Sequence, residues 1–169
     1  MGMIRGIINK YQMRKRPISY LRSLGAHIGE GCEIYPSANF MEPYLISLGN
    51  NVRINEGVQF VTHDGGVWVI RNKYRKYKNI DLFGKIKVGD NVHIGTNAVI
   101  MPGVSIGNNC IIGVGSIVTK DIPDGSIAVG VPARVIEDVN EYLDKNKEKF
   151  INTKQLSTED KKDYLMEHL

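Results

Sequence analysis

The side chains best suited to acid–base or thiol chemistry in this 169-residue sequence are four histidines and two cysteines. Imidazole titrates near neutral pH, so a well-placed histidine can take a proton from a hydroxyl group. His63 ends a regular sequence pattern just before a long irregular segment, and long loops on a rigid scaffold are often functional. His27 precedes the pattern, His93 falls at an outward position within it, and His168 lies near the C-terminus. We therefore predict that His63 is the catalytic histidine.

The scaffold that positions the histidines and cysteines is indicated by a six-residue repeat of aliphatic side chains. Unbroken hexads start at Val88, Ile94, Ile100, Ile106, Ile112 and Val118. Small or apolar residues follow at the fifth positions, Val92, Ala98, Val104, Cys110, Ser116 and Ile122. An α-helix repeats every ~3.6 residues and a strand every two, so neither explains this period. A solenoid of short parallel strands does, because each hexad can form one face of a triangular coil.

The pattern extends toward the N-terminus through two further turns of three hexads each. Their starts are Ile28, Ile34, Phe40, Leu48, Ile54 and Phe60, with a two-residue offset between the turns. We therefore predict an all-β solenoid over residues 27–136 that is interrupted by an excursion loop over residues 65–85. The excursion contains the single tryptophan, Trp68, together with Tyr74 and Tyr77.

The two cysteines have a structural explanation in this pattern. Cys32 and Cys110 both occupy the fifth position of a hexad, a small site that points inward. Each is expected to behave there as a small apolar residue. Their coils lie far apart in the stack, so we predict no disulfide between them.

Both ends of the chain are predicted to be helical, over residues 1–26 and 137–169. The first segment has apolar residues at helical spacing among basic ones, at Ile4, Ile7, Ile8 and Tyr11. This face suits a cap on the open end of the solenoid, or at most a peripheral membrane contact. A short helix over Ser19–Leu24 should stop at Gly25. The tail should hold one helix over Glu137–Phe150 and a second from Ser157.

Composition narrows the class of protein further. The net charge of +4 is modest. Nucleic-acid binding would need a basic face with aromatics, and we expect the basic residues to form a solvated surface instead. No run approaches the ~20 apolar residues of a membrane span, and the N-terminus lacks the apolar core of a signal peptide. We expect a cytoplasmic protein.

Four segments carry a resemblance to a known family. They are Val61–Asp64 (VTHD), Ile94–Val104 (IGTNAVIMPGV), Ile112–Pro123 (IGVGSIVTKDIP) and Gly130–Arg134 (GVPAR). With the excursion, they resemble the galactoside, maltose and streptogramin O-acetyltransferases over roughly Leu21 to Ile136. The resemblance implies a left-handed parallel β-helix, an exception to the usual right-handed crossover. It also implies a homotrimer that binds acetyl-CoA between subunits and uses no metal.

The resemblance also implies roles for individual residues. His63 matches the family's catalytic base. Thr96 and Val114 match positions that line the pantetheine groove of CoA. Thr119 and Lys120 match the segment near the nucleotide, and Arg134 matches a cation beside its phosphates, for which basic side chains are suited. Some relatives have a second basic residue where this chain has Glu137.

The acceptor site is predicted from weaker signals. Asn39 lies near the place where sugar-acetylating relatives have an acceptor-binding Asn. Within the excursion, Trp68 could stack on a sugar ring, and Arg75 and Lys76 could attract an anionic group. The acceptor is then a sugar or a surface-polysaccharide building block, with a negatively charged sugar as one option. Glu56 and Asp64 are candidates for the carboxylate that orients His63.

Three alternatives remain open from the sequence. The acceptor could be a sugar amine, which would make the protein an N-acetyltransferase. The same solenoid occurs in zinc carbonic anhydrases, but these need three histidine ligands and only His63 and His93 fall on the solenoid here. A non-catalytic assembly scaffold is the third alternative, although the retained excursion and His63 favour an enzyme.

Overall fold

The computed structural model describes residue 9 and residues 11–168, so Ile4, Ile7 and Ile8 of the predicted amphipathic face lie outside the described residues. The chain divides into two compact units, Met1–Val139 and Asn140–Leu169. The first unit is a stack of β-coils with three sheets that run along it. We call these sheets A, B and C.

Each coil contributes one short strand to each sheet. Sheet A contains β1 (His27–Ile28), β4 (Ile46–Leu48), β7 (Ile86–Val88) and β10 (Ser105–Ile106). Sheet B contains β2 (Glu33–Ile34), β5 (Arg53–Ile54), β8 (His93–Ile94), β11 (Ile111–Ile112), β13 (Ser126–Gly130) and β14 (Ala133–Asp138). Sheet C contains β3 (Asn39–Phe40), β6 (Gln59–Phe60), β9 (Val99–Ile100) and β12 (Ile117–Val118). Neighbouring strands pair in parallel, except for the antiparallel β13–β14 hairpin.

The hexad positions predicted to point inward form the core. Phe60, Ile94 and Ile112 have no solvent exposure, and the rings of Phe40 and Phe60 stack with centroids 4.6 Å apart. Cys32 and Cys110 are buried and free, as predicted. Burial raises the pKa of the Cys110 thiol, which keeps it protonated. Apolar burial along one continuous axis therefore holds the coils together.

The turns contain different numbers of residues, and the differences lie at the corners between the sheets. Arg53 pairs with Glu33 twenty positions earlier, and η1 (Pro43–Leu45) accommodates the extra residues of that turn at the corner between sheets C and A. The last turn is shorter than the hexad pattern predicts. Ile122, expected at a fifth hexad position, instead bridges Ile106 of sheet A sixteen positions earlier. The corner before Ile122 is therefore two residues shorter than in a regular turn of three hexads, and the closing hairpin follows it.

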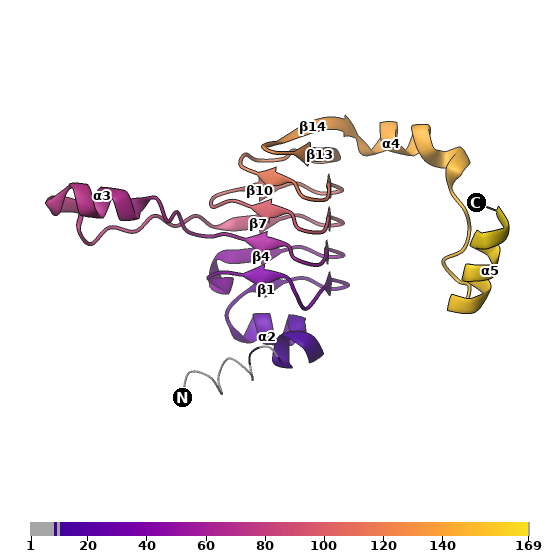
Figure 1. The fold of residues 1–169 in the computed structure, drawn as a ribbon, viewed down its shortest axis with the longest axis horizontal. Helices are drawn as coiled ribbons and strands as arrows, with labels where there is room; N and C mark the ends of the chain where they lie inside the picture. Colours follow the sequence, from indigo (N-terminus) through magenta and orange to yellow (C-terminus); the bar gives the residue numbers. More distant parts are fainter. Residues whose placement is uncertain (1–8, 10, 169) are drawn as a thin grey trace. The chain divides into compact units, whose positions relative to one another are not determined.

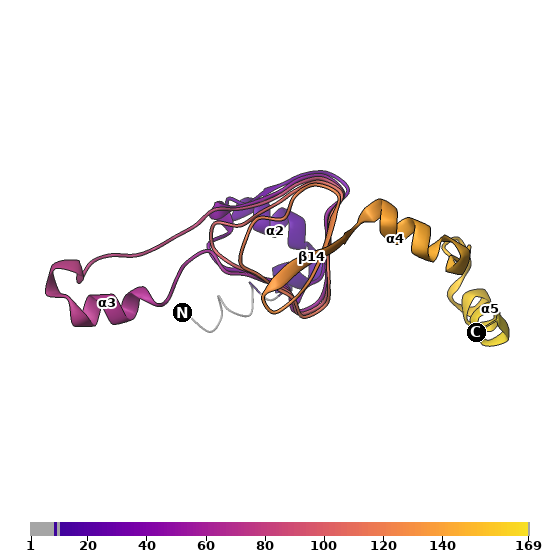
Figure 2. The same cartoon turned by 90° about the horizontal axis from the view of Figure 1, so that it is seen from above.

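The two ends of the stack are closed differently (Figure 1). At one end α2 (Pro17–Ser23) buries Leu21 against the first coil, and Gly25 follows it with φ +93°, a conformation that favours glycine. At the other end lies the β13–β14 hairpin. Viewed from above, the coils superimpose in a three-sided outline (Figure 2).

The excursion leaves the coil after Phe60 at the corner between sheets C and A. Its two stems pair with each other: His63 bridges Phe83, and the amide N–H of Gly84 donates to the carbonyl of Thr62 at 2.8 Å. Between the stems lie α3 (Val67–Lys73) and η2 (Arg75–Tyr77), which project away from the coils in both views (Figures 1 and 2).

The second unit contains α4 (Val139–Asn146), η3 (Lys147–Lys149) and α5 (Thr158–His168). The hydroxyl of Ser157 accepts from the amide N–H of Asp160 at 3.1 Å, so Ser157 caps α5 as expected. The prediction of a helix from Glu137 is wrong at its start. Residues 137 and 138 are the end of β14, because they pair with residues 127 and 126 of β13. Among the residues that the structure describes, no helix is long and apolar enough to cross a membrane.

Candidate active site

His63 lies where the chain leaves the coil, and it contacts a carboxylate from the turn below. Its Nδ1 atom is 3.0 Å from Oε2 of Glu42. The register of sheet C explains this contact, because Phe40 pairs with Phe60. The same twenty-residue offset brings Glu42 under Thr62, whose hydroxyl donates to Oε2 of Glu42. Two neighbouring side chains of the upper turn therefore share one carboxylate of the lower turn.

The carboxylate beside His63 is neither of the two predicted. Asp64 instead accepts the amide N–H of Gly66 at 2.7 Å and so stabilises a turn in its own loop. Glu56 lies at a different corner of the coil, after β5. The signal that could have identified Glu42 is the twenty-residue spacing between the first two turns.

Glu42 determines which ring nitrogen of His63 can act as a base. Its pKa is lowered, mainly by the hydrogen bond from Thr62 and then by that with His63, so the carboxyl is ionised at neutral pH. An ionised carboxylate only accepts hydrogen bonds, so Nδ1 of His63 carries the hydrogen in this pair. Nε2 then keeps a free lone pair, as a general base requires.

His63 and Glu42 line a cavity of about 400 Å³ at the foot of the excursion. Trp68 and Phe83 also line it, and the ring of Phe83 meets the ring of His63 edge-on at 5.9 Å. Aromatic faces and a nearby base suit a sugar ring, whose C–H faces pack on aromatics while its hydroxyls reach polar groups.

Charge in this cavity does not favour an anionic acceptor. Arg71 is its one basic residue among the described lining residues, and Nη1 of Arg71 pairs with Asp81 at 3.0 Å. The predicted Arg75 and Lys76 are not lining residues. Lys76 lies over the ring of Tyr77, with its Nζ 4.6 Å from the ring centroid. Of the predicted acceptor residues in the excursion, only Trp68 lies in the cavity.

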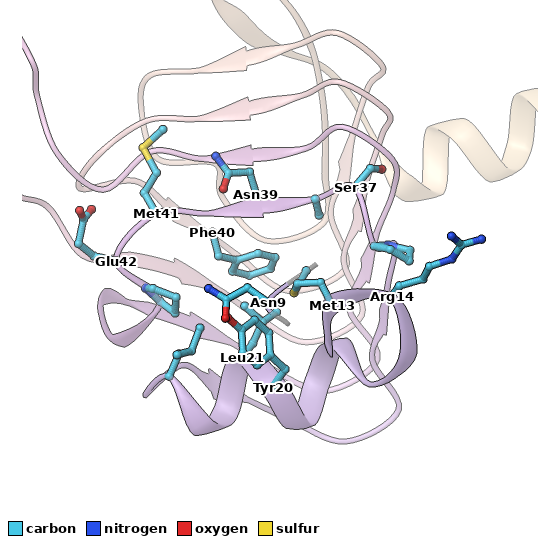
Figure 3. Close-up of a pocket in the computed structure, with 14 residues that line it drawn as sticks. Asn9, Met13, Arg14, Tyr20, Leu21, Ser37, Asn39, Phe40, Met41 and Glu42 are labelled. Carbon is cyan, nitrogen blue, oxygen red and sulfur yellow. The ribbon is translucent and has the colours of Figure 1, made fainter. Parts of the chain in front are cut away.

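Asn39 lies in a second cavity of about 730 Å³, between the N-terminal helical segment and the first coil (Figure 3). Its lining is largely apolar and includes Met13, Leu21 and Phe40. The side-chain amide of Asn39 donates to Oε1 of Gln59 at 3.0 Å, so part of its hydrogen-bonding capacity is already used within sheet C. Asn39 and His63 therefore line different cavities of the chain.

The predicted CoA residues separate into two columns along the coil. Thr96 and Val114 lie one above the other at the corner between sheets B and C, and Val114 is 74% exposed. Thr119 and Lys120 are exposed at the corner between sheets C and A, above the turn that carries His63. Arg134 is exposed on β14 in the closing hairpin.

The two columns therefore lie at opposite edges of sheet C. The described residues contain no group of three or more His, Cys, Asp or Glu that could hold a metal ion. His93 lies half-buried in sheet B, where burial and then the charge of Arg53 lower its pKa.

The coil of hexads points to the class of hexapeptide-repeat transferases, and comparison with known proteins agrees. A family model described as bacterial transferase hexapeptide (six repeats) matches residues 85–120. Protein CapG of Staphylococcus aureus is 46% identical over 160 residues, which cover 92% of this chain and 91% of CapG. The chain belongs to the hexapeptide-repeat acetyltransferases; it is an acyltransferase, and its coil is a left-handed β-helix.

Further relatives share parts of the chain. Galactoside O-acetyltransferase of Escherichia coli K12 is 40% identical over 121 residues, which cover 70% of this chain but 58% of that protein. The solved maltose O-acetyltransferase from Clostridium difficile 630 superposes with a TM-score of 0.59 at 27% identity, over 78% of this chain and 82% of that chain. A galactoside acetyltransferase in complex with coenzyme A gives 0.54 at 28% identity, over 92% of this chain and 88% of that chain.

Proposed function

We propose that the protein transfers the acetyl group of acetyl-CoA to a hydroxyl of a sugar or surface-polysaccharide building block in the cytoplasm, with His63 as the general base. The observation that carries this proposal is the contact between His63 and Glu42, which leaves Nε2 of His63 free to accept a proton. The relatives named for galactoside and maltose O-acetylation support a sugar hydroxyl as the acceptor.

The proposed reaction needs no covalent enzyme intermediate. The acceptor oxygen attacks the thioester carbonyl while Nε2 of His63 takes its proton, and a tetrahedral intermediate forms. Collapse of this intermediate breaks the C–S bond, and the departing CoA thiolate takes the proton back from the imidazolium. Holding the two substrates together supplies much of the rate increase, since a bimolecular encounter becomes a reaction within one complex.

The proposed assembly is a homotrimer with three active sites between protomers. Its support is the division of the candidate residues into two columns that a single prism cannot bring together. Closed rotational symmetry repeats one such contact three times with no unpaired surface left over.

A thiol-release assay tests the proposed function. We expect CoA thiol to appear when acetyl-CoA is mixed with a neutral sugar acceptor and to be slower with the 2-amino analogue at equal concentration. No acetyl-dependent thiol release across a panel of neutral, anionic and amino sugars would contradict the proposal. Faster release with the amine would instead identify an N-acetyltransferase.

Charge reversal at the nucleotide end tests the donor site. Lys120→Glu and Arg134→Glu should each weaken acetyl-CoA binding about 3- to 30-fold at low salt, because like charges then face the CoA phosphates. The loss should shrink at high ionic strength, where exposed charges are screened. Calorimetric titration checks both values. Lys87→Glu, on the exposed face of sheet A, is the matched control, and equal binding by all three variants would place the two cations outside the donor site.

A further inference from the structure

A third cavity, of about 230 Å³, lies at the corner between sheets B and C, away from the His63 cavity of the same protomer. It is lined by Tyr35, Arg53, Asn55, Glu56 and Thr96. Every one of these side chains can donate or accept hydrogen bonds, and together they offer a hydroxyl, a guanidinium, an amide and a carboxylate. Such a set is suited to a ligand with several hydroxyl groups.

One group in this cavity lacks the partner that buried polar atoms normally have. Oδ1 of Asn55 is buried and accepts no hydrogen bond within the described part of the chain. More than about 90% of such groups are paired in folded proteins, and leaving one unpaired is costly. The terminal torsion of asparagine is broad, so a small rotation can bring this oxygen to a hydroxyl donor in the cavity.

The neighbouring side chains are only partly engaged. Nη2 of Arg53 donates to the hydroxyl of Tyr35 over a long 3.5 Å, and Nε of Arg53 is 3.4 Å from a carboxylate oxygen of Glu33. The guanidinium therefore retains donors for a further acceptor atom. Arg53 is held near the cavity without having its hydrogen-bonding capacity used up.

The height of this cavity along the coil matches that of His63. Asn55 and His63 belong to the same turn, and His63 follows Asn55 by eight positions. Thr96 lies one turn higher, since the amide N–H of Asn97 donates to the carbonyl of Glu56 at 2.9 Å. Val114 follows in the next turn, since the amide N–H of Gly115 donates to the carbonyl of Thr96 at 2.8 Å. Rotation about a three-fold axis parallel to the coil preserves height.

We propose that this corner cavity is the acceptor-recognition half of each active site, supplied by the protomer beside the one that supplies His63, and that Asn55 hydrogen-bonds a hydroxyl of the acceptor. In this arrangement the pantetheine arm of the donor runs along Val114 and Thr96, and its thioester lies at the level of the neighbour's His63. The acceptor lies below the thioester, beside Asn55. This inference rests on the proposed function and adds to it the residue that selects the acceptor.

Kinetics of Asn55→Ala test the role of this residue. The acceptor KM should rise about 5- to 20-fold, the effect of one lost hydrogen bond in a closed site, while the KM for acetyl-CoA and the melting temperature stay close to those of the wild type. Asn152→Ala, in the exposed tail, is the matched control. An unchanged acceptor KM would overturn the proposal.

Subunit mixing tests whether the cavity and His63 come from different protomers. His63→Ala and Asn55→Ala chains are co-expressed at equal amounts, and light scattering verifies the trimers. In random trimers about one site in four combines an intact His63 with an intact Asn55 of the neighbour. At low acceptor concentration, activity should be about 3- to 10-fold that of the two variants assembled separately, given the 5- to 20-fold range expected for Asn55→Ala.

The outcomes separate this inference from the proposed function. Mixed trimers with no gain in activity, or an active monomer, would overturn the shared cavity while leaving acetyl transfer intact. A wild-type protein that releases no thiol from acetyl-CoA, or a His63→Ala homotrimer with full turnover, would overturn the proposed function itself.

Discussion

Replacing His63 with alanine should lower kcat by about 10²–10⁴-fold, the usual loss when a general base is removed. The reason is the contact with Glu42, which holds the hydrogen on Nδ1 and leaves Nε2 as the acceptor for the hydroxyl proton. Steady-state thiol release measures this effect. The fold should stay intact because the His63 side chain is 42% exposed and lies outside the core.

His27→Ala is the matched control for this prediction. His27 is exposed on β1 at the first coil, far along the sequence from the excursion, and its removal should leave kcat unchanged. Near-normal turnover of purified His63→Ala would show that another group takes the proton. Circular dichroism of both variants should match the wild type, which separates loss of chemistry from loss of structure.

The second large effect is expected for Glu42→Gln, which preserves size but removes the charge. The neutral amide can donate to Nδ1 as well as accept from it, so the ring tautomer with hydrogen on Nε2 becomes accessible and the base is lost in that state. We expect kcat to fall by about 10²-fold, less than the ~10⁴ seen when a histidine-orienting carboxylate is neutralised in a serine protease. This result would make Glu42 a positioning residue for His63.

Nitrogen NMR of the His63 ring provides a readout that a purely structural role would not change. The wild type should show hydrogen on Nδ1, and Glu42→Gln should show a mixture of the two neutral tautomers. Glu30→Gln, which alters an exposed carboxylate paired with Arg22, is the control and should change neither tautomer nor kcat. A Glu42→Gln enzyme with wild-type kcat and an unchanged tautomer would remove Glu42 from the mechanism.

The direction of the Glu42 pKa shift also defines a pH window. Because hydrogen bonds from Thr62 and then His63 lower this pKa in the folded protein, the pair stabilises the fold above the carboxyl's unfolded pKa. That stabilisation is lost as pH falls through the lower, folded value. In the wild type, Glu42 therefore stays ionised throughout the neutral range, and a change in kcat there cannot come from its protonation.

Much of the fold follows from the sequence because the inward positions of a β-coil obey a short-range rule. Each aliphatic start and each small fifth residue, such as Ile94 and Ala98, points to the same axis whatever the distant residues are. His63 could be singled out for a related reason, since a break in a strict period is visible locally. The helix predicted from Glu137 is wrong at its start, because pairing with β13 overrides a composition typical of helices.

The contacts between turns depend on which residues of one turn lie above which residues of the next. The hexad period alone does not show this. Glu42 meets His63 only because the first two turns are offset by twenty residues, and Ile122 reaches Ile106 only because the last turn is shortened. The corner of Asn55 and Thr96 is likewise separated from that of His63 by the width of sheet C. The sequence by itself determined the coil and its core, and it singled out His63 as the candidate base. Only the tertiary structure showed which carboxylate contacts His63 and that the candidate site is divided between two corners. The physical reason is that the number of residues in each corner sets which residues of neighbouring turns lie next to each other.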